Sequence, residues 1–340
     1  MSPLLQVEDL AVTFTRKGAA PVRAVDGVSF DVAAGEVVGL VGESGCGKSV
    51  TSLAVMGLLP RGRGTRVTGK VLFEGSDLLQ ESDRRLARRR GKDLAMVFQD
   101  PMTSLNPVLT LGRQLTEVLA EHTDLSRSAR QREALDLLGR VGIPDPRRRL
   151  GEYPHQLSGG MRQRVLIAIA LACSPRLIIA DEPTTALDVT IQAQVLDLLT
   201  TLVRESGTAM VLITHDLGVV AGTCDRVSVL YAGRVVESAD RGALFARPRH
   251  RYTEGLLAAV PRVDSPRGTP LHPVRGSVRD LLPWAQGCAF APRCDHADDA
   301  CARPDLPLIA VGGDTVGPGN GEAHPARCVH PAPTRTGVAS

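Results

Sequence analysis

Short apolar runs rich in valine and isoleucine alternate with longer segments of helical periodicity up to about Glu254. Such runs predict buried strands and the segments between them predict helices, so their alternation is typical of an α/β domain with a largely parallel sheet. The expected strands span residues 36–41, 94–98, 177–180, 210–214 and 226–230. The expected helices span residues 47–59, 160–173, 189–206 and 216–221.

The pattern changes after about Val260. Twelve of the 23 prolines and four of the seven cysteines lie between Pro261 and Ser340. Proline at this density prevents long helices, so we expect an irregular Cys/Pro-rich extension with a disordered end. The chain is therefore predicted to contain one domain over residues 1–254 and the extension over residues 255–340. This agrees with the count of about two domains that is usual for a chain of this length.

The composition excludes several classes of protein. Hydrophobic residues make up 43% of the chain and the mean hydropathy is zero, which excludes a disordered chain. The longest apolar stretch, residues 165–173, is far shorter than the ~18 residues that a membrane helix needs. The N-terminus has no secretory signal. We therefore expect a reducing cytosol, where the seven cysteines would not form structural disulfides.

Charge and aromatic content give no sign of nucleic acid. The formal net charge is +3, and only 3% of the residues are aromatic, too few for a protein that stacks on single-stranded bases. A basic run, interrupted by Leu86 and Ala87, comprises Arg84, Arg85, Arg88, Arg89 and Arg90. This spacing favours a solvated helical face over a nucleic-acid contact.

Residues 42–49 read Gly-Glu-Ser-Gly-Cys-Gly-Lys-Ser, between an expected strand and an expected helix. This is the phosphate-loop pattern in the context it requires, which disfavours a chance Gly-rich turn. Its glycines let backbone N–H groups surround an anion, and the helix N-terminus adds positive charge. Lys48 would contact the β- and γ-phosphates, and the Ser49 hydroxyl would bind Mg²⁺. The nucleotide-contacting positions are Gly42, Ser44, Gly45, Cys46, Gly47, Lys48, Ser49 and Val50.

An apolar strand that ends in two carboxylates follows downstream. Asp181 and Glu182 come directly after the expected strand at residues 177–180. Asp181 is expected to join the Mg²⁺ shell, and Glu182 to polarise a water against the γ-phosphate as a general base. A core strand that ends in an acidic turn is common with one carboxylate and less so with two. Together with the phosphate loop, the pair predicts an ATP-hydrolysing site.

Four further motifs follow the phosphate loop in an order that we identify with one family. The sequence Leu-Ser-Gly-Gly-Met-Arg-Gln-Arg at residues 157–164 resembles the signature sequence of the ABC-transporter ATPases. Gln99 resembles their Q-loop, residues 186–188 their D-loop, and His215 their switch histidine. The resemblance covers roughly residues 4–252. It implies an α/β P-loop cassette in which a RecA-like core carries an antiparallel β subdomain and a helical subdomain.

The resemblance also implies how the site residues act. ATP lies between two cassettes arranged head to tail, so that the phosphate loop of one faces Ser158, Gly159 and Gly160 of the other. Those residues would begin an expected helix, whose N-terminus can bind phosphate. Gln99 is implied to contact Mg²⁺ and the γ-phosphate, and Gln99 and His215 join Glu182 in the catalytic set. Phe14 matches the ring that stacks on adenine, with a core phenylalanine of the first strand as the alternative.

The sequence around these motifs narrows the family. Residues 41–45, 98–107 and 153–161 resemble importers of dipeptides, oligopeptides and nickel, and residues 250–257 resemble the start of their C-terminal extension. The resemblance implies the ATPase subunit of such an importer, peripheral at the cytoplasmic face of the cell membrane. The implied partners are a second ABC ATPase in a hetero- or homodimer, two transmembrane permease subunits and an extracytoplasmic solute-binding protein, with no nucleic acid.

The alternative is a soluble ABC ATPase that acts on ribosomes or DNA. Ribosome-acting relatives usually carry two cassettes, whereas this chain has one. Repair and chromosome ATPases carry a long coiled coil or large insertions between the phosphate loop and the signature. Here the segment from Gln99 to Leu157 is short and is expected to hold only a compact helical region. Both comparisons favour the transporter, and the transported solute stays open.

Cys288, Cys294, Cys301 and Cys328 lie together in the extension. A segment with few core-forming residues often needs a staple, and four thiolates can supply one by binding metal. Their gaps are wider than the C-x₂₋₄-C pairs of zinc sites, whereas a [4Fe–4S] cluster takes one cysteine per iron. The extension also resembles that of peptide-importer ATPases, some of which hold such a cluster. Unliganded thiols, or zinc with His296, His324 or His330, are the alternatives.

Overall fold

The computed structural model describes residues 2–60, 62, 64–185, 187–260, 274–278, 287–304, 306–310 and 324–332. The chain divides into two compact units, each built from three segments of sequence. Unit 1 comprises Met1–Leu4, Val32–Glu36 and Asp77–Ile213, and unit 2 comprises Leu5–Asp31, Val37–Ser76 and Thr214–Ser340. The disordered end expected for the extension falls on residues 333–340, which lie outside the described residues.

Parallel strands form the sheet of unit 1, in the order β6 (Leu94–Val97), β7 (Leu177–Asp181) and β8 (Ala209–Thr214). Every residue of β7 and β8 is buried, which explains why both strands read as nearly continuous apolar runs. Val97 lies opposite Ala180 in the register of β6 and β7. The two strands therefore end at the same edge of the sheet. Gln99 and Glu182, which follow these strand ends, lie near each other for this reason.

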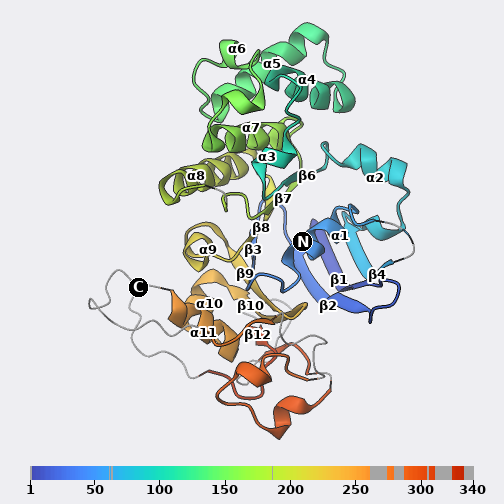
Figure 1. Cartoon of the computed structure of the whole chain (residues 1–340), viewed down its shortest axis with the longest axis vertical. Coiled ribbons are helices and arrows are strands. Elements are labelled where there is room, and N and C mark those ends of the chain that lie inside the picture. Colours follow the sequence, from blue (N-terminus) through green and yellow to red (C-terminus); the bar gives the residue numbers. More distant parts are fainter. Residues whose placement is uncertain are drawn as a thin grey trace. The chain divides into compact units, whose positions relative to one another are not determined.

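A group of helices connects β6 to β7 within unit 1. Helices α4 (Leu111–His122) and α5 (Arg127–Arg140) pack against each other and against α7 (Gly159–Leu171). Figure 1 shows them in green. Helices α4 and α5 form the compact helical region expected before the signature. The other helical elements of unit 1 are η1 (Leu78–Gln80), α2 (Asp83–Arg89), α3 (Pro101–Ser104), α6 (Pro146–Arg149), η2 (Pro154–Gln156) and α8 (Val189–Ser206).

The basic run forms a solvated helical face on α2, as expected. The Ser82 hydroxyl caps the helix by accepting from the backbone N–H of Arg85, at 3.4 Å. Leu86 is buried, whereas the arginines at positions 84, 85 and 88 are exposed. The half-buried Arg89 pairs with Glu81 at 2.9 Å. The run is therefore held by local packing and ion pairing.

The N-terminal part of unit 2 is an antiparallel sheet, shown in blue in Figure 1, with the order β2-β1-β4-β5. Leu5 lies opposite Phe73, and both are fully buried. A bulge interrupts the register between Glu8 and Ala11. This sheet confirms the antiparallel β subdomain. Its strands are β1 (Leu5–Phe14), β2 (Val22–Val32), β4 (Thr65–Phe73) and β5 (Ser76–Asp77).

The remaining strands of unit 2 pair in both parallel and antiparallel directions. Strand β3 (Val37–Val41) is parallel to β9 (Arg226–Tyr231), which is antiparallel to β10 (Arg234–Asp240). The short strands β12 (Pro325–Ala326) and β11 (Ile309–Ala310) continue the sheet beyond β10. The helical elements here are α1 (Lys48–Val55), α9 (Leu217–Thr223), α10 (Arg241–Ala246), α11 (Arg251–Ala259), η4 (Ala291–Arg293) and η5 (Asp299–Ala302).

The strands and helices expected from the apolar pattern are all present. The one larger error is at α1, which stops at Val55 instead of residue 59, whereas the other ends agree within two residues. Gly57 adopts a left-handed φ of 61°, and the N–H of Leu58 donates to the carbonyl of Leu53 at 2.8 Å. This is the hydrogen-bond pattern with which a glycine ends a helix. The prediction failed because the apolar pattern continues to Leu59, whereas the helix ends where the backbone turns at Gly57.

A buried carboxylate joins the extension to β10. Glu237 is fully buried and accepts hydrogen bonds from the backbone N–H groups of Arg249 at 2.6 Å and His250 at 2.9 Å. Its third partner is the Nε2 of His324, at 2.6 Å. His250 itself is buried, and its Nδ1 accepts from the N–H of Tyr252 at the start of α11. Burial lowers the pKa of His250 to about 4.

Replacement of His250 by asparagine should reduce the acid sensitivity of the fold. His250→Asn keeps a capping acceptor and removes the ionisable ring. The pKa of His250 lies near 4 in the folded chain and near 6.5 when unfolded, so only the unfolded chain gains the proton between those values. Stability is lost as the pH falls through this window, by up to about 3 kcal/mol. Denaturant unfolding at several pH values should show a smaller loss in His250→Asn, and equal losses would contradict the prediction.

Candidate functional site

The phosphate loop of unit 2 connects β3 to α1 through a tightly packed backbone. Gly42 has a φ of 154°, and a Cβ there would lie 2.2 Å from the carbonyl oxygen of Leu230. Gly47 has a φ of 104°, and its Cβ would lie 2.6 Å from the carbonyl oxygen of Ala24. Both positions therefore require glycine. The loop is fixed against neighbouring strands while Ser44, Gly45 and Ser49 remain exposed.

Lys48 is buried under the loop that it follows. Its side chain is 5% exposed, and its Nζ donates to the carbonyl oxygens of Gly42 at 2.7 Å and Glu43 at 3.0 Å. Cys46 is fully buried beside it, and burial raises the pKa of the Cys46 thiol. The ammonium group is thus held at the start of α1, the helix terminus that favours anions.

Two other expected residues of unit 2, Phe14 and His215, lie at the ends of strands. Phe14 is the last residue of β1 and is half-buried, so it is not part of the closed core. His215 follows β8 and is exposed. Val50 lies in the first turn of α1 and is half-buried. The half-buried ring of Phe14 leaves the stacking interpretation in place.

Gln99 and Glu182 meet in unit 1 at the end of the parallel strands. The Gln99 Nε2 donates to Glu182 Oε2 at 2.9 Å, and the Thr185 hydroxyl donates to the same oxygen at 2.9 Å. Glu182 has a φ of 46°, unusual for a residue other than glycine. Asp181, one residue earlier, is buried at the end of β7. The edge of the sheet therefore gathers the two carboxylates and the amide that the sequence predicted.

The signature segment begins a long helix, as expected. Ser158 is the N-cap of α7, and its hydroxyl accepts from the N–H of Met161 at 3.4 Å. Gly159 is exposed and Gly160 is half-buried. A Cβ on Gly160 would lie 2.6 Å from Cγ2 of Ile191 in α8, which is closer than side chains approach. The glycines therefore leave the helix N-terminus open and let α7 lie against α8.

The four cysteines of the extension face one small pocket in unit 2. Cys288, Cys294, Cys301 and Cys328 line it together with apolar side chains that include Phe290 and Leu306. Cys301 is buried and the other three are half-buried. Burial raises the pKa of Cys288 to about 11 and also raises the pKa of Cys328. A donor set of four soft thiols from separate loops fits an iron–sulfur cluster or another thiolate-bound metal.

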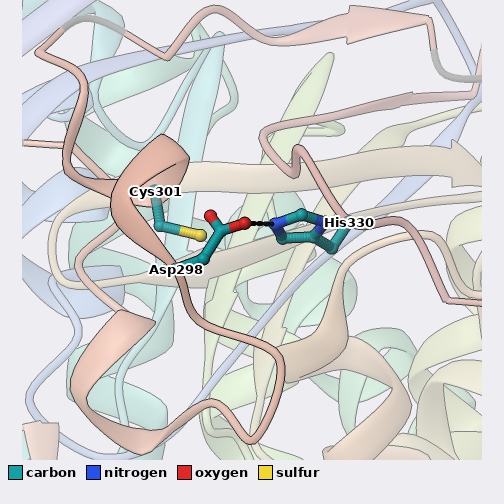
Figure 2. A group of neighbouring side chains, drawn as sticks. All are labelled: Asp298, Cys301 and His330. Atoms are coloured by element: carbon teal, nitrogen blue, oxygen red, sulfur yellow. Dashed lines mark ion pairs between the residues drawn. The ribbon is translucent and has the colours of Figure 1, made fainter.

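Histidines contribute unequally to this pocket. His330 and Asp298 form an ion pair at 2.8 Å, and Figure 2 shows Cys301 beside them. His296 also lines the pocket. His324, in contrast, is absent from the lining and contacts Glu237. Of the histidines considered for zinc, His324 is therefore engaged elsewhere.

Comparison with known families and proteins decides the identity of the chain. The family described as "ABC transporter" matches residues 25–185, and the family described as "Oligopeptide/dipeptide transporter, C-terminal region" matches residues 236–301. The dipeptide transport ATP-binding protein DppD of Bacillus subtilis is 52% identical over 303 residues, 89% of this chain and 90% of the relative. The oligopeptide transport ATP-binding protein AppD of the same organism is 52% identical over 320 residues, 93% and 96%.

The chain belongs to the ABC-transporter ATP-binding subunits of the oligopeptide/dipeptide type. Among solved structures, the dimeric cassette MJ0796 bound to ADP and Pi is similar, with a TM-score of 0.62 and 29% identity over 70% of this chain and 98% of that chain. The ABC ATPase fold is thereby confirmed. The activity of this cassette is ATP hydrolysis, with ATP as its nucleotide and Mg²⁺ as the accompanying metal. Among the described residues, no helix has the length and apolar character to cross a bilayer.

Two residues that contact the phosphate loop of this ABC ATPase were missed by the sequence analysis. The Tyr252 hydroxyl accepts from the N–H of Glu43 at 2.9 Å. The Arg293 guanidinium pairs with the Glu43 carboxylate, also at 2.9 Å. These residues follow Glu43 by 209 and 250 positions, and no spacing rule connects them. Tyr252 lies in the segment 250–257 that resembles the family's extension, but nothing in the sequence connects it or Arg293 to Glu43.

Gly42 provides a test of the backbone geometry of the phosphate loop. Gly42→Ala should weaken ATP binding by the cassette about tenfold, because strain of about 1–3 kcal/mol is forced on the loop. The matched control is Gly242→Ala in α10, where nothing lies within 4 Å of the added Cβ. Gly242→Ala should keep ATP affinity and stabilise the fold by up to about 1 kcal/mol. Equal ATP affinities of the two variants in nucleotide titrations would refute the assigned geometry.

Proposed function

We propose that this chain is the ATP-hydrolysing subunit of an importer, which energises the uptake of peptides or a similar solute through separate permease subunits. The observation that carries the proposal is the match over about nine tenths of the chain to ATP-binding proteins whose names specify dipeptide and oligopeptide transport. The match includes the C-terminal region of such transporters. The proposed boundary between cassette and extension stays at residues 254 and 255.

The proposed chemistry assigns one task to each residue of the site. Lys48 would exchange its two carbonyl partners for the β- and γ-phosphates, which suits a buried ammonium already aimed at the loop. Ser49, Gln99 and Asp181 would hold Mg²⁺. Glu182 would accept a proton from the attacking water, with Gln99 and His215 as the other members of the catalytic set. The remaining proposed contacts to the nucleotide are Phe14, Gly42, Ser44, Gly45, Cys46, Gly47, Val50, Ser158, Gly159 and Gly160.

The contacts of Glu182 support its proposed role as the base. Both donors, Gln99 and Thr185, contact Oε2, so the carboxylate is held in one orientation. The exposed Gln99 links this carboxylate to the segment that leads into α3. A change at Gln99 on nucleotide binding can therefore reach the helical region of unit 1. In the proposed cycle this region contacts the permease.

The proposed assembly contains two cassettes, two transmembrane permease subunits and an extracytoplasmic solute-binding protein. The second cassette is either a sister ABC ATPase or a copy of this chain. The exposed Ser158 and Gly159 at the start of α7 support a composite site, because they present an open helix N-terminus. We place the chain peripherally at the cytoplasmic face of the membrane, without a nucleic-acid partner.

Glu182→Gln tests the proposed function at its chemical step. The change keeps the size of the side chain and removes the base, so ATP hydrolysis by the complex should fall about 10²–10⁴-fold while ATP binding survives. Uptake of labelled peptide in a deletion strain should be restored by the wild type and not by Glu182→Gln. The matched control is Glu205→Gln, an exposed position in α8, which should restore uptake.

Co-purification identifies the partners. The chain purified from native membranes should bring permease subunits with it, as read by mass spectrometry. Recovery with ribosomes or DNA and without membrane proteins would contradict the transporter. Hydrolysis by Glu182→Gln at the wild-type rate would contradict the role of the base.

We also propose that Cys288, Cys294, Cys301 and Cys328 hold a [4Fe–4S] cluster with a structural role. All four line one pocket, and the backbone supports that arrangement. The N–H of Cys288 donates to the carbonyl of Cys301 at 2.9 Å, and the N–H of His296 donates to the sulfur of Cys294 at 3.4 Å. When bound, the cluster would cross-link these loops. ATP hydrolysis needs no redox step, so the cluster takes no part in it.

Anaerobic purification should yield protein with iron and acid-labile sulfide in equal amounts. The variant with all four cysteines changed to serine should lose both and unfold more easily in the extension. The matched control is Cys173→Ser, which alters a half-buried cysteine of unit 1 and should keep the iron. Zinc in place of iron, or iron-free protein of unchanged stability, would contradict the cluster.

A further inference from the structure

Arg293 of the extension is a buried arginine whose guanidinium is fully engaged. Its side chain is 5% exposed, and it precedes Cys294. The two Nη atoms donate to the two carboxylate oxygens of Glu43, each at 2.9 Å. Nη1 also donates to the Tyr231 hydroxyl at 3.2 Å. Nη2 and Nε donate to the carbonyl oxygens of Gly276, Val274 and Arg275.

Aromatic rings enclose this pair. The guanidinium carbon of Arg293 lies 5.7 Å from the ring centroid of Tyr231 and 5.8 Å from that of Phe290. The Tyr231 and Tyr252 rings are 4.6 Å apart, and Phe290 lies 5.4 Å from each of them. A two-pronged ion pair in such a setting is directional as well as attractive. The position of Arg293 is therefore fixed, and it fixes the Glu43 carboxylate in turn.

Glu43 is the second residue of the phosphate loop, and each of its polar groups is held. Its N–H donates to the Tyr252 hydroxyl at 2.9 Å, its carbonyl accepts from Lys48 Nζ at 3.0 Å, and its carboxylate receives Arg293. The contact therefore runs from the extension, through one loop residue, to the lysine aimed at the phosphates. All of these residues belong to unit 2.

We propose that Arg293 is a positioning residue for the ATPase reaction. Through Glu43 it holds the phosphate loop in the conformation that receives ATP, so ATP affinity depends on the folded state of the extension. Removal of one member of a buried ion pair leaves the other without its partner, and here the residue left is in the loop. By linkage, bound ATP must stabilise the extension to the same degree. This inference rests on ATP binding by the cassette and not on the solute or metal proposed above.

The first test measures ATP binding and turnover of the full-length chain. Arg293→Gln should raise the dissociation constant of MgATP and the KM about tenfold, with little change in kcat, because no reacting group is altered. Arg293→Lys keeps the charge but loses the two-pronged geometry, so its affinity should be intermediate. The matched control is Arg303→Gln, an exposed arginine of the same extension, which should bind MgATP like the wild type.

The double variant distinguishes positioning from a general loss of folding. If Arg293 acts through the Glu43 carboxylate, Glu43→Gln should weaken binding as well, and Glu43→Gln/Arg293→Gln should be no weaker than the worse single variant. Losses that multiply would show two independent effects and overturn the inference. Glu43→Gln leaves the extension sequence intact, so this arm remains informative if Arg293→Gln fails to fold.

A thiol in the loop reports its conformation without any assay of activity. Cys46 is fully buried between Gly45 and Gly47, so loosening of the loop should expose it. Alkylation of Cys46, followed by peptide mass spectrometry, should be faster in Arg293→Gln and Glu43→Gln than in the wild type or Arg303→Gln. MgATP should slow it in all four. Folded Arg293→Lys and Arg293→Gln variants with wild-type ATP affinity and Cys46 reactivity would overturn the inference.

Discussion

A charge that the fold removes from water must receive a partner from the fold, and this constraint organises the region around the phosphate loop. Lys48, Arg293 and Glu237 are each at least nine-tenths buried. Lys48 donates to carbonyl oxygens of the loop, and Arg293 pairs with Glu43. Glu237 contacts two backbone N–H groups and His324. In the last two cases one partner comes from the cassette and the other from the extension. The cassette and the extension are thus joined by polar contacts of defined direction, which hold the extension in one arrangement on the cassette.

The described part of the extension gains little from regular structure. Beyond the end of α11, its described elements are the short turns η4 and η5 and the two-residue strands β11 and β12. Few of its side chains belong to the closed core, among them Phe290, Leu306 and Ala326. A segment of this kind holds its shape through specific anchors because apolar burial alone is too small. The ion pair at Glu43 and the hydrogen bonds at Glu237 supply two such anchors, and the proposed metal would be a third.

Much of the fold and of the ATP site could be predicted from the sequence, because local rules govern them. A buried parallel strand is a continuous apolar run, as in β7 and β8. A phosphate loop needs glycine at the positions where Gly42 and Gly47 approach other backbone. Gln99 and Glu182 could be assigned to one site because Gln99 resembles the Q-loop of the family and Glu182 ends an apolar strand, and the structure joins the two. Each of these inferences depends on a few consecutive residues.

The sequence could not reveal the partners that tertiary structure brings to those residues. Tyr252 on Glu43, His324 on Glu237 and Arg293 on Glu43 obey no periodicity or motif. The end of α1 was misjudged for a related reason, because one glycine conformation at Gly57 outweighed a continuing apolar pattern. Contacts across hundreds of residues are decided by how strands and loops pack. Sequence patterns describe the strands and not that packing.

The interleaving of the two units along the chain has a consequence for biosynthesis. All segments of unit 1 have been made once Ile213 is added, whereas unit 2 begins at Leu5 and draws on the chain beyond Thr214. The phosphate loop is among the first parts translated, yet Arg293 follows Glu43 by 250 residues, an interval of roughly 10–50 s at ribosomal speed. A nascent or prematurely terminated chain therefore carries the loop without the residues that hold it. The nucleotide pocket can therefore form fully only after the residues that hold the loop have been translated.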